Sequence, residues 1–319
     1  MLPSKVIREP KMKEIIMLIL LFFTALLCKA QPPTDPSHGK IYALVTKINE
    51  KKPVHYGSFE EMKELDFNTI HYVSIENRGN KTSMDTLLLH NLLNNAPNLT
   101  SLTIGRNIYL DHFPKIEKNN HLKELYLIGN NLLKIPEDID NLIALDFFEC
   151  TGNKIETLPN NFSNLKKLKA LILKGNNIKF FPGEILKLQN LNLLWVSDKI
   201  KTIPENIDDL SQLEKLAFTN TDVSTLPKSF SRLKNLKHID LSNNQFTVFP
   251  SPLLKLKQVK ILSLNENPIT KTALEKSLKG IKLENATIYI PLREEEFSEI
   301  KKTYNKINFI PEMVSVDTK

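Results

Sequence analysis

Residues 168–188 read LKALILKGNNIKFFPGEILKL, and this stretch decides the fold. Its first part has the spacing LxxLxL, in which Leu171 and Leu173 fall on the same side of an extended chain. Asn176 follows where the chain has to turn, and Pro182 fixes φ and ends the extended segment. The pattern predicts a short strand, a turn and a second short segment that returns the chain to its start.

The same pattern recurs at a near-constant interval along the chain. A single unit of this size cannot bury its apolar side alone, so neighbouring units must stack and their strands must form a parallel sheet. The unit that opens at Leu191 is one position shorter than the others, and Ile70, Val73 and Ile75 fit a degenerate earlier unit. The eight regular units open at Leu99, Leu122, Leu145, Leu168, Leu191, Leu213, Leu236 and Val259.

Two polar or rigid columns accompany the leucines. The ninth slot of each unit is mostly asparagine, whose amide can both donate to and accept from the backbone of turning coils. Lys199 and Thr221 are predicted to replace asparagine in two units. After the proline column, apolar residues recur three apart, which predicts short helical or 3₁₀ turns on the convex side. The asparagines are Asn107, Asn130, Asn153, Asn176, Asn244 and Asn267, and the prolines are Pro114, Pro136, Pro159, Pro182, Pro204, Pro227 and Pro250.

The form LxxLxLxxNxIxxLPxxIxxL resembles the leucine-rich-repeat family, in its 23-residue LP-containing type. The resemblance covers about residues 70–280. It implies an α/β solenoid of horseshoe form, with a parallel concave sheet and short helical or 3₁₀ convex segments. It also implies that a protein or peptide partner binds the concave face.

The ends of the array need caps, because a solenoid exposes its core there. Ser58 and Glu61 form a capping box that opens a helix, and residues 85–95 and 270–279 are predicted to be helical. Residues 286–290 read as a strand, and residues 292–304 as a charged helix. The predicted organisation is a signal peptide at 1–30, a lead segment at 31–57, an N-terminal cap with the degenerate repeat at 58–98, eight repeats at 99–280 and a C-terminal cap at 281–319.

The segment 1–30 reads as an export signal. Residues 15–27 form an apolar run after a basic stretch, and Ala30 precedes the predicted cleavage. The run is shorter than the roughly 20 residues that span a bilayer, so no stable membrane span is expected after cleavage. An uncleaved anchor and lipidation at Cys28 stay as alternatives, and Met12 is an alternative start. The predicted location is secreted or in the cell envelope, either periplasmic or on the outer surface.

The composition favours a binding protein over an enzyme. The chain is 41% hydrophobic and 25% charged, and its net charge of +7 falls to +4 without the segment 1–30, which gives no reason to expect nucleic acid. Cys150 then remains as a single cysteine in an inward slot, so it cannot form an internal disulfide and is predicted to be an inert buried thiol. The absence of disulfides suits a bacterial exported protein. No catalytic motif, metal site or cofactor site is recognisable in the sequence.

The third, fifth and seventh slots of each unit alternate away from the core. In the middle units these slots hold large apolar side chains on a face that should meet water, and such patches commonly bind partners. The chain's only tryptophan, Trp195, lies among them. The predicted partner-binding residues, here called the concave patch, are Tyr126, Ile128, Phe147, Glu149, Ile172, Leu193 and Trp195. The alternative is a structural repeat protein of the cell envelope with no dedicated ligand site.

Overall fold

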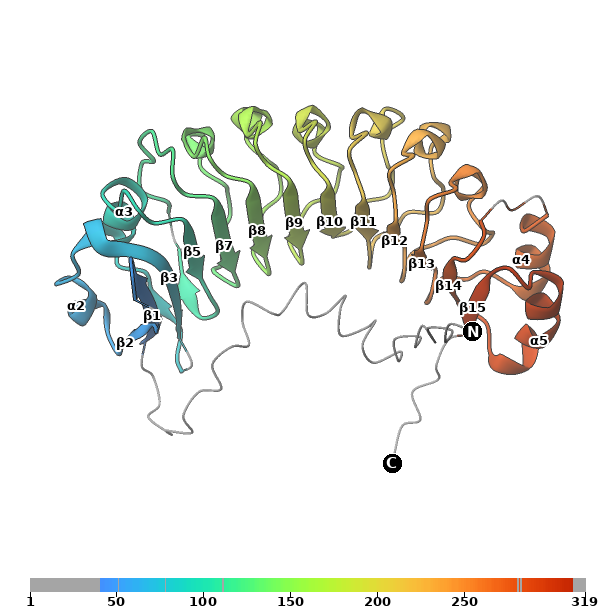
Figure 1. The fold of residues 1–319 in the computed structure, drawn as a ribbon, viewed down its shortest axis with the longest axis horizontal. Helices are drawn as coiled ribbons and strands as arrows, with labels where there is room; N and C mark the ends of the chain where they lie inside the picture. Colours follow the sequence, from blue (N-terminus) through green and yellow to red (C-terminus); the bar gives the residue numbers. More distant parts are fainter. Residues whose placement is uncertain are drawn as a thin grey trace, which may run out of the picture. The chain divides into compact units, whose positions relative to one another are not determined.

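The computed structural model describes residues 41–50, 52–77, 79–110, 112–279, 281 and 283–311, all within one compact unit that spans residues 39–319. The predicted signal peptide and its alternatives lie outside these residues. Within this unit the long sheet has 13 strands, in the order β15-β14-β13-β12-β11-β10-β9-β8-β7-β5-β3-β1-β2. Figure 1 shows the repeat strands along the inner side of the arc and the 3₁₀ turns along its outer side. The predicted solenoid with a parallel concave sheet is confirmed.

The eight repeat strands pair in parallel and in phase. Leu171, for example, lies opposite Phe148 in one neighbour and Leu194 in the other. Such fourth-slot and sixth-slot side chains are almost completely buried, so the coils share one continuous core. The strands are β5 (Ser101–Ile104), β7 (Glu124–Ile128), β8 (Phe147–Thr151), β9 (Ala170–Lys174), β10 (Leu193–Ser197), β11 (Lys215–Phe218), β12 (His238–Asp240) and β13 (Ile261–Ser263).

The convex side consists of short 3₁₀ turns, as the three-residue spacing predicts. Phe162, Ile185 and Phe230 point from these turns into the core and are fully buried. Poor hydrogen-bond geometry limits such turns to a few residues, and each of them ends after one buried apolar contact. They are η2 (Ile139–Asn141), η3 (Asn160–Asn164), η4 (Gly183–Lys187), η5 (Ile207–Asp209), η6 (Lys228–Arg232) and η7 (Ser251–Lys255).

The asparagine column connects successive coils, as predicted. Asn153 is the clearest case: its Oδ1 accepts from the backbone N–H groups of Asn130 and Leu132, at 3.0 and 3.1 Å. Its Nδ2 donates to the carbonyl of Leu127 at 2.9 Å. The column thereby satisfies backbone groups that have left the sheet.

Two strands of the long sheet lie within residues 41–56, in the predicted lead segment, where no strand was expected. β1 (Ile41–Lys47) lies antiparallel to β3 (Ile70–Asn77), and β2 (Val54–Tyr56) lies antiparallel to β1 at the edge. β3 pairs in parallel with β5, with Val73 opposite Leu102 and Ile75 opposite Ile104, in the frame expected of the degenerate unit. Ser58 caps α2 (Phe59–Met62), which is shorter than predicted, and Asp85 caps α3 (Thr86–Asn94). The cap is completed by η1 (Phe67–Thr69), β4 (Thr82–Ser83) and β6 (Ile108–Tyr109).

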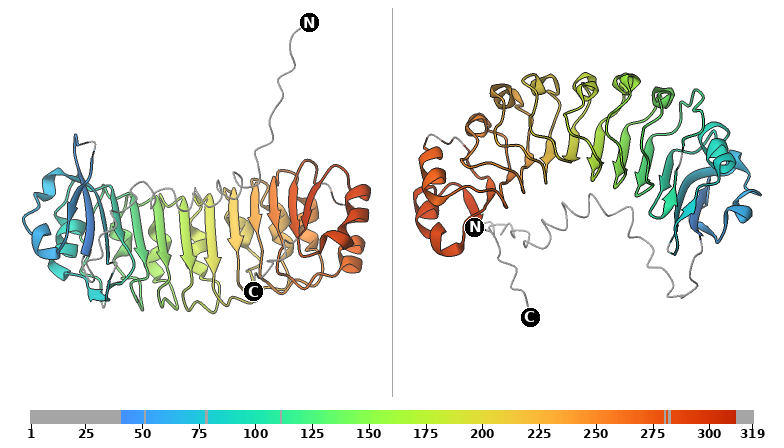
Figure 2. Two further views of the ribbon diagram at one scale, coloured as in Figure 1. Left: turned by 90° about the horizontal axis from the view of Figure 1, so that it is seen from below. Right: turned by 180° about the vertical axis from the view of Figure 1, so that it is seen from behind.

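The C-terminal cap follows the predicted order. Thr270 caps α4 (Lys271–Ser277), and β14 (Thr287–Ile290) pairs in parallel with β13. After α5 (Glu294–Thr303), an additional strand, β15 (Asn308–Pro311), extends the sheet. Ile300 of α5 is 1% exposed, so this helix covers the end of the core (Figure 2). In the part of the chain that the structure describes, no helix has the length and apolar character needed to cross a membrane.

The shortened unit lacks its eighth-slot residue. In most other units this residue has a positive φ, as in Gly175 and Asn220, and its N–H donates to a carbonyl of the next coil. In the shortened unit Ser197 is followed directly by Asp198, which is buried and accepts from the N–H of Asn176. Asp198 therefore fills the asparagine position, and the prediction that Lys199 does so is wrong. Spacing alone cannot tell which residue of a coil has been deleted.

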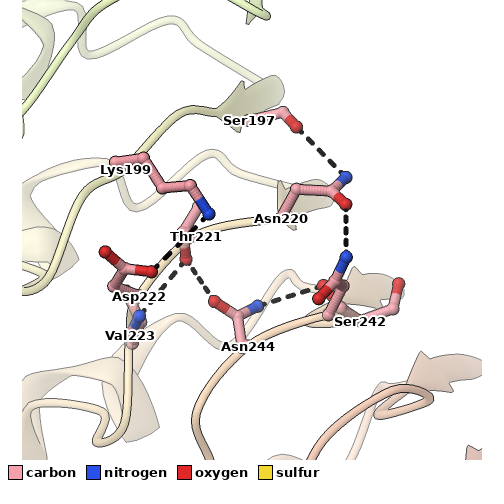
Figure 3. Close-up of polar contacts among 9 residues, drawn as sticks. Ser197, Lys199, Asn220, Thr221, Asp222, Val223, Ser242 and Asn244 are labelled. Carbon is pink, nitrogen blue, oxygen red and sulfur yellow. Dashed lines mark hydrogen bonds and ion pairs between the residues drawn. The ribbon is translucent and has the colours of Figure 1, made fainter.

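Polar side chains connect the shortened unit and the coils after it (Figure 3). Lys199 is exposed and pairs with Asp222, with Nζ 3.8 Å from Oδ1. Thr221 occupies the asparagine position of the next coil, as predicted, and its hydroxyl donates to the Oδ1 of Asn244. Asn220 donates from Nδ2 to the hydroxyl of Ser197 at 3.3 Å. Side chains thus supply part of the cohesion between these coils.

Candidate partner-binding surface

The structure brings the predicted concave patch together on four neighbouring strands, β7 to β10. In the fifth slot, Tyr126 lies opposite Glu149, Glu149 opposite Ile172, and Ile172 opposite Trp195. Phe147 and Leu193, in the third slot, flank Ala170 on the strand between them. Adjacent strands lie about 4.8 Å apart, so the fifth-slot side chains of these four strands lie side by side.

Not all of these side chains reach water. Tyr126 is 8% exposed and Ile172 is 2% exposed, so the expectation that both face solvent is wrong. The Tyr126 ring packs against Phe147, with centroids 4.8 Å apart, and Ile172 lies between Glu149 and Trp195. Ile128, Phe147, Leu193 and Trp195 are half-buried. Large neighbours on a concave sheet cover one another, and this reduces the accessible part of the patch.

Trp195 is held in a defined orientation. Its Nε1 donates to the hydroxyl of Thr219 on the next coil at 3.0 Å. Lys174 places its Nζ 4.0 Å from the centroid of the Trp195 ring. A cation over an aromatic face is attracted by the negative face of the ring. The ring is thus pinned at its edge and covered by an ammonium group.

Two carboxylates of the concave face, Glu149 on β8 and Asp240 on β12, interact electrostatically with this ammonium group. Burial raises the pKa of Glu149, and the hydroxyl of Thr151, which donates to it at 2.8 Å, and the charge of Lys174 oppose that rise. Burial likewise raises the pKa of Asp240, against donation from Ser242 and the charge of Lys174. Burial lowers the pKa of Lys174, while Glu149 and Asp240 act in the opposite direction. Glu149, Lys174 and Asp240 interact electrostatically across the concave face and are here called the charge cluster.

Lys174, Thr219 and Asp240 were not among the predicted site residues. The alternation of slots does place all three on the concave face. The criterion of large apolar residues on the concave face does not select these three residues, because each is polar.

Cys150 does not belong to this surface. It lies in the sixth, inward slot, is fully buried, and accepts a contact from the Nδ2 of Asn153 at 3.3 Å. Burial raises the pKa of its thiol to about 12. The predicted burial of this thiol is confirmed, and its raised pKa disfavours the thiolate, which is the reactive form.

Family comparisons agree with this architecture. A family model described as "Leucine-rich repeat region" matches residues 99–217, and one described as "Leucine Rich Repeat" matches residues 235–256. The chain contains leucine-rich repeats. Leucine-rich-repeat proteins use their extended concave surfaces for binding in general. No curated protein matches the chain significantly.

Solved leucine-rich-repeat structures resemble it at low identity. A chain of the Toll–Spätzle complex of Drosophila is 20% identical, with a TM-score of 0.57, over 67% of this chain and 30% of that chain. A leucine-rich-repeat protein of Leptospira interrogans is 22% identical over 73% of this chain and 76% of its own, with a TM-score of 0.48. Internalin C2 of Listeria monocytogenes is 19% identical over 76% and 87%, also with a TM-score of 0.48. At these identities the likeness concerns the fold alone.

Proposed function

We propose that this leucine-rich-repeat protein is an exported binding protein that recognises a protein or peptide partner through the concave patch. The observation that carries the proposal is the position of Trp195, half-buried at the middle of the concave face and fixed by Thr219. Tryptophan is among the residues that contribute most to binding when a partner covers it. A ring that is already oriented loses little entropy on binding.

Replacing Trp195 by alanine is expected to weaken partner binding by about 2 kcal/mol or more, roughly 30-fold in Kd. The partner would first be captured from the native cell envelope on the immobilised mature chain. Its affinity for the wild-type and Trp195→Ala chains would then be measured by surface plasmon resonance.

Phe180→Ala is the matched control. Phe180 is an aromatic side chain that is 83% exposed, and it lies outside the strands, shortly before Pro182. Its loss should leave the affinity unchanged. Equal affinity of the Trp195→Ala and wild-type chains would contradict the proposed binding face.

Export is a separate part of the proposal and has its own test. Residues 15–27 and Ala30 support cleavage after Ala30. Mass spectrometry of the protein from its native cells is expected to show a chain that begins at Gln31. A chain that retains the segment 1–30 would reject cleavage, and a mass increment at Cys28 would indicate lipidation instead.

A further inference from the structure

The charge cluster around Trp195 is a cation site that the chain fills with its own lysine. Lys174 extends from β9 over the ring of Trp195 on β10, with Nζ 4.0 Å from the ring centroid. Its charge is stabilised by Glu149 on β8 and by Asp240 on β12. An aromatic face with a carboxylate two strands away on either side is a suitable environment for an ammonium or guanidinium group.

Burial of the three charged groups of this site costs free energy. Burial shifts the pKa of Lys174 downward and the pKa values of Glu149 and Asp240 upward, so each group loses hydration that its partners restore only in part. Hydroxyl groups of Thr151 and Ser242 donate to the two carboxylates and hold them in place. Packing of the solenoid needs none of these charges, because the sheet is held by its core leucines.

We propose that the concave patch binds a partner through a basic side chain of that partner, which takes the place of Lys174 between Glu149, Asp240 and the Trp195 ring. This inference rests on the proposed function of the concave face. The occupant is a peptide segment with an exposed arginine or lysine. Arginine fits best, since its planar group stacks on an aromatic ring and forms paired hydrogen bonds with carboxylates.

Charge complementarity favours a basic partner over an acidic one. The cluster contains two carboxylates and one ammonium group, so displacement of Lys174 would leave two carboxylates for a basic side chain of the partner to balance. An incoming carboxylate would approach both Glu149 and Asp240. Lys215 and His238 lie in the third slot of β11 and β12, and the pKa of His238 is lowered by burial and by neighbouring lysines, so it adds little positive charge at neutral pH.

The test uses a phage-displayed library of dodecapeptides selected on the mature chain. The best binders would be synthesised together with copies in which each arginine is replaced by citrulline and each lysine by norleucine. Affinities would be measured by calorimetry, and Trp195, the chain's only tryptophan, reports local binding by its fluorescence. One basic residue is expected to matter in each binder, with its replacement weakening affinity about tenfold.

Two substitutions of the protein distinguish the alternatives. Lys174→Met vacates the site and should tighten the binding of basic peptides at least threefold, whereas weaker binding would overturn the inference. Glu149→Gln should weaken the original peptides about tenfold and leave the citrulline or norleucine copies unchanged. Glu156→Gln, an exposed carboxylate outside the strands, is the control. Circular dichroism would verify that each variant folds.

The outcomes separate this inference from the proposed function. Binders that are lost on Trp195→Ala but contain no sensitive basic residue would overturn the inference and leave concave-face binding intact. A set of binders that all tolerate Trp195→Ala would reject the concave patch itself.

Discussion

Replacing Asp198 by asparagine is expected to stabilise the protein by about 3 kcal/mol at pH 8. Asp198 is 5% exposed, and its Oδ2 has no hydrogen-bond partner among the described residues. In equivalent coils the side-chain amide donates from this position to a carbonyl of the preceding coil, as Asn176 does to Cys150 at 2.8 Å. An ionised carboxylate cannot donate, so Oδ2 lacks the hydrogen bond that an asparagine amide would form.

The effect depends on pH in a defined direction. Burial raises the pKa of Asp198 from 3.8 to about 7, against donation from the backbone of Asn176 and Ile178. Because the folded-state pKa is the higher one, the stability that the bound proton provides is complete below about pH 4 and is lost as the pH rises to about 7. The rise of the Asp198 pKa from 3.8 to about 7 corresponds to at most about 4 kcal/mol of folding free energy.

Urea denaturation of the wild-type and Asp198→Asn chains at several pH values would measure this difference. The stability gain of the variant should grow between pH 4 and pH 7 and stay constant above pH 7. Asn153→Asp is the reciprocal variant and should introduce the same pH dependence in a normal coil. A gain for Asp198→Asn that does not change with pH would contradict the assignment of a buried proton.

Asn153→Ala is expected to destabilise the protein by about 3 kcal/mol. The substitution removes the acceptor of the N–H groups of Asn130 and Leu132 and the donor to the carbonyl of Leu127. Each buried polar group left without a partner costs about 1 to 3 kcal/mol. The array stacks by contacts between neighbours, so one broken coil weakens the interfaces on both of its sides.

Thermal unfolding followed by circular dichroism would detect this loss. Asn177→Ala is the control, because Asn177 is exposed and its neighbour Asn176 occupies the column. Exposed substitutions of this kind usually change stability by less than about 0.5 kcal/mol. Similar losses for the two variants would show that the asparagine column does not hold the coils together.

Much of the fold could be predicted because one pattern repeats. Leu171 and Leu173 fix strand, face and register for their own unit, and the period carries this information to every other unit. β1 and β2 escaped prediction because they belong to no repeat, and their antiparallel pairing has no periodic signal. The alignment of Asp198 escaped for another reason: a deletion is visible in the spacing, but only the hydrogen bonds show where it falls.

The sequence predicts where the candidate site lies better than it predicts the chemical environment of that site. Slot alternation brings Phe147, Leu193 and Trp195 onto one face, and the structure agrees. It cannot tell that Tyr126 is covered by Phe147, or that Lys174 bends over the neighbouring strand, because both depend on side-chain conformation. The sequence therefore does not show that Lys174, Thr219 and Asp240 belong to one site.

The missing eighth-slot residue, close to Trp195, also interrupts a series of backbone hydrogen bonds between coils. Before it, Gly129, Gly152 and Gly175 link each coil to the next through their N–H groups, and after it Asn220 and Asn243 do the same. The coil of Asp198 lacks this backbone link to the next coil, and side-chain contacts such as Asn220 to Ser197 connect the two coils instead. Glu149 on β8 and Asp240 on β12 lie on opposite sides of this junction. A partner bound to both residues would connect the coils on the two sides of the junction.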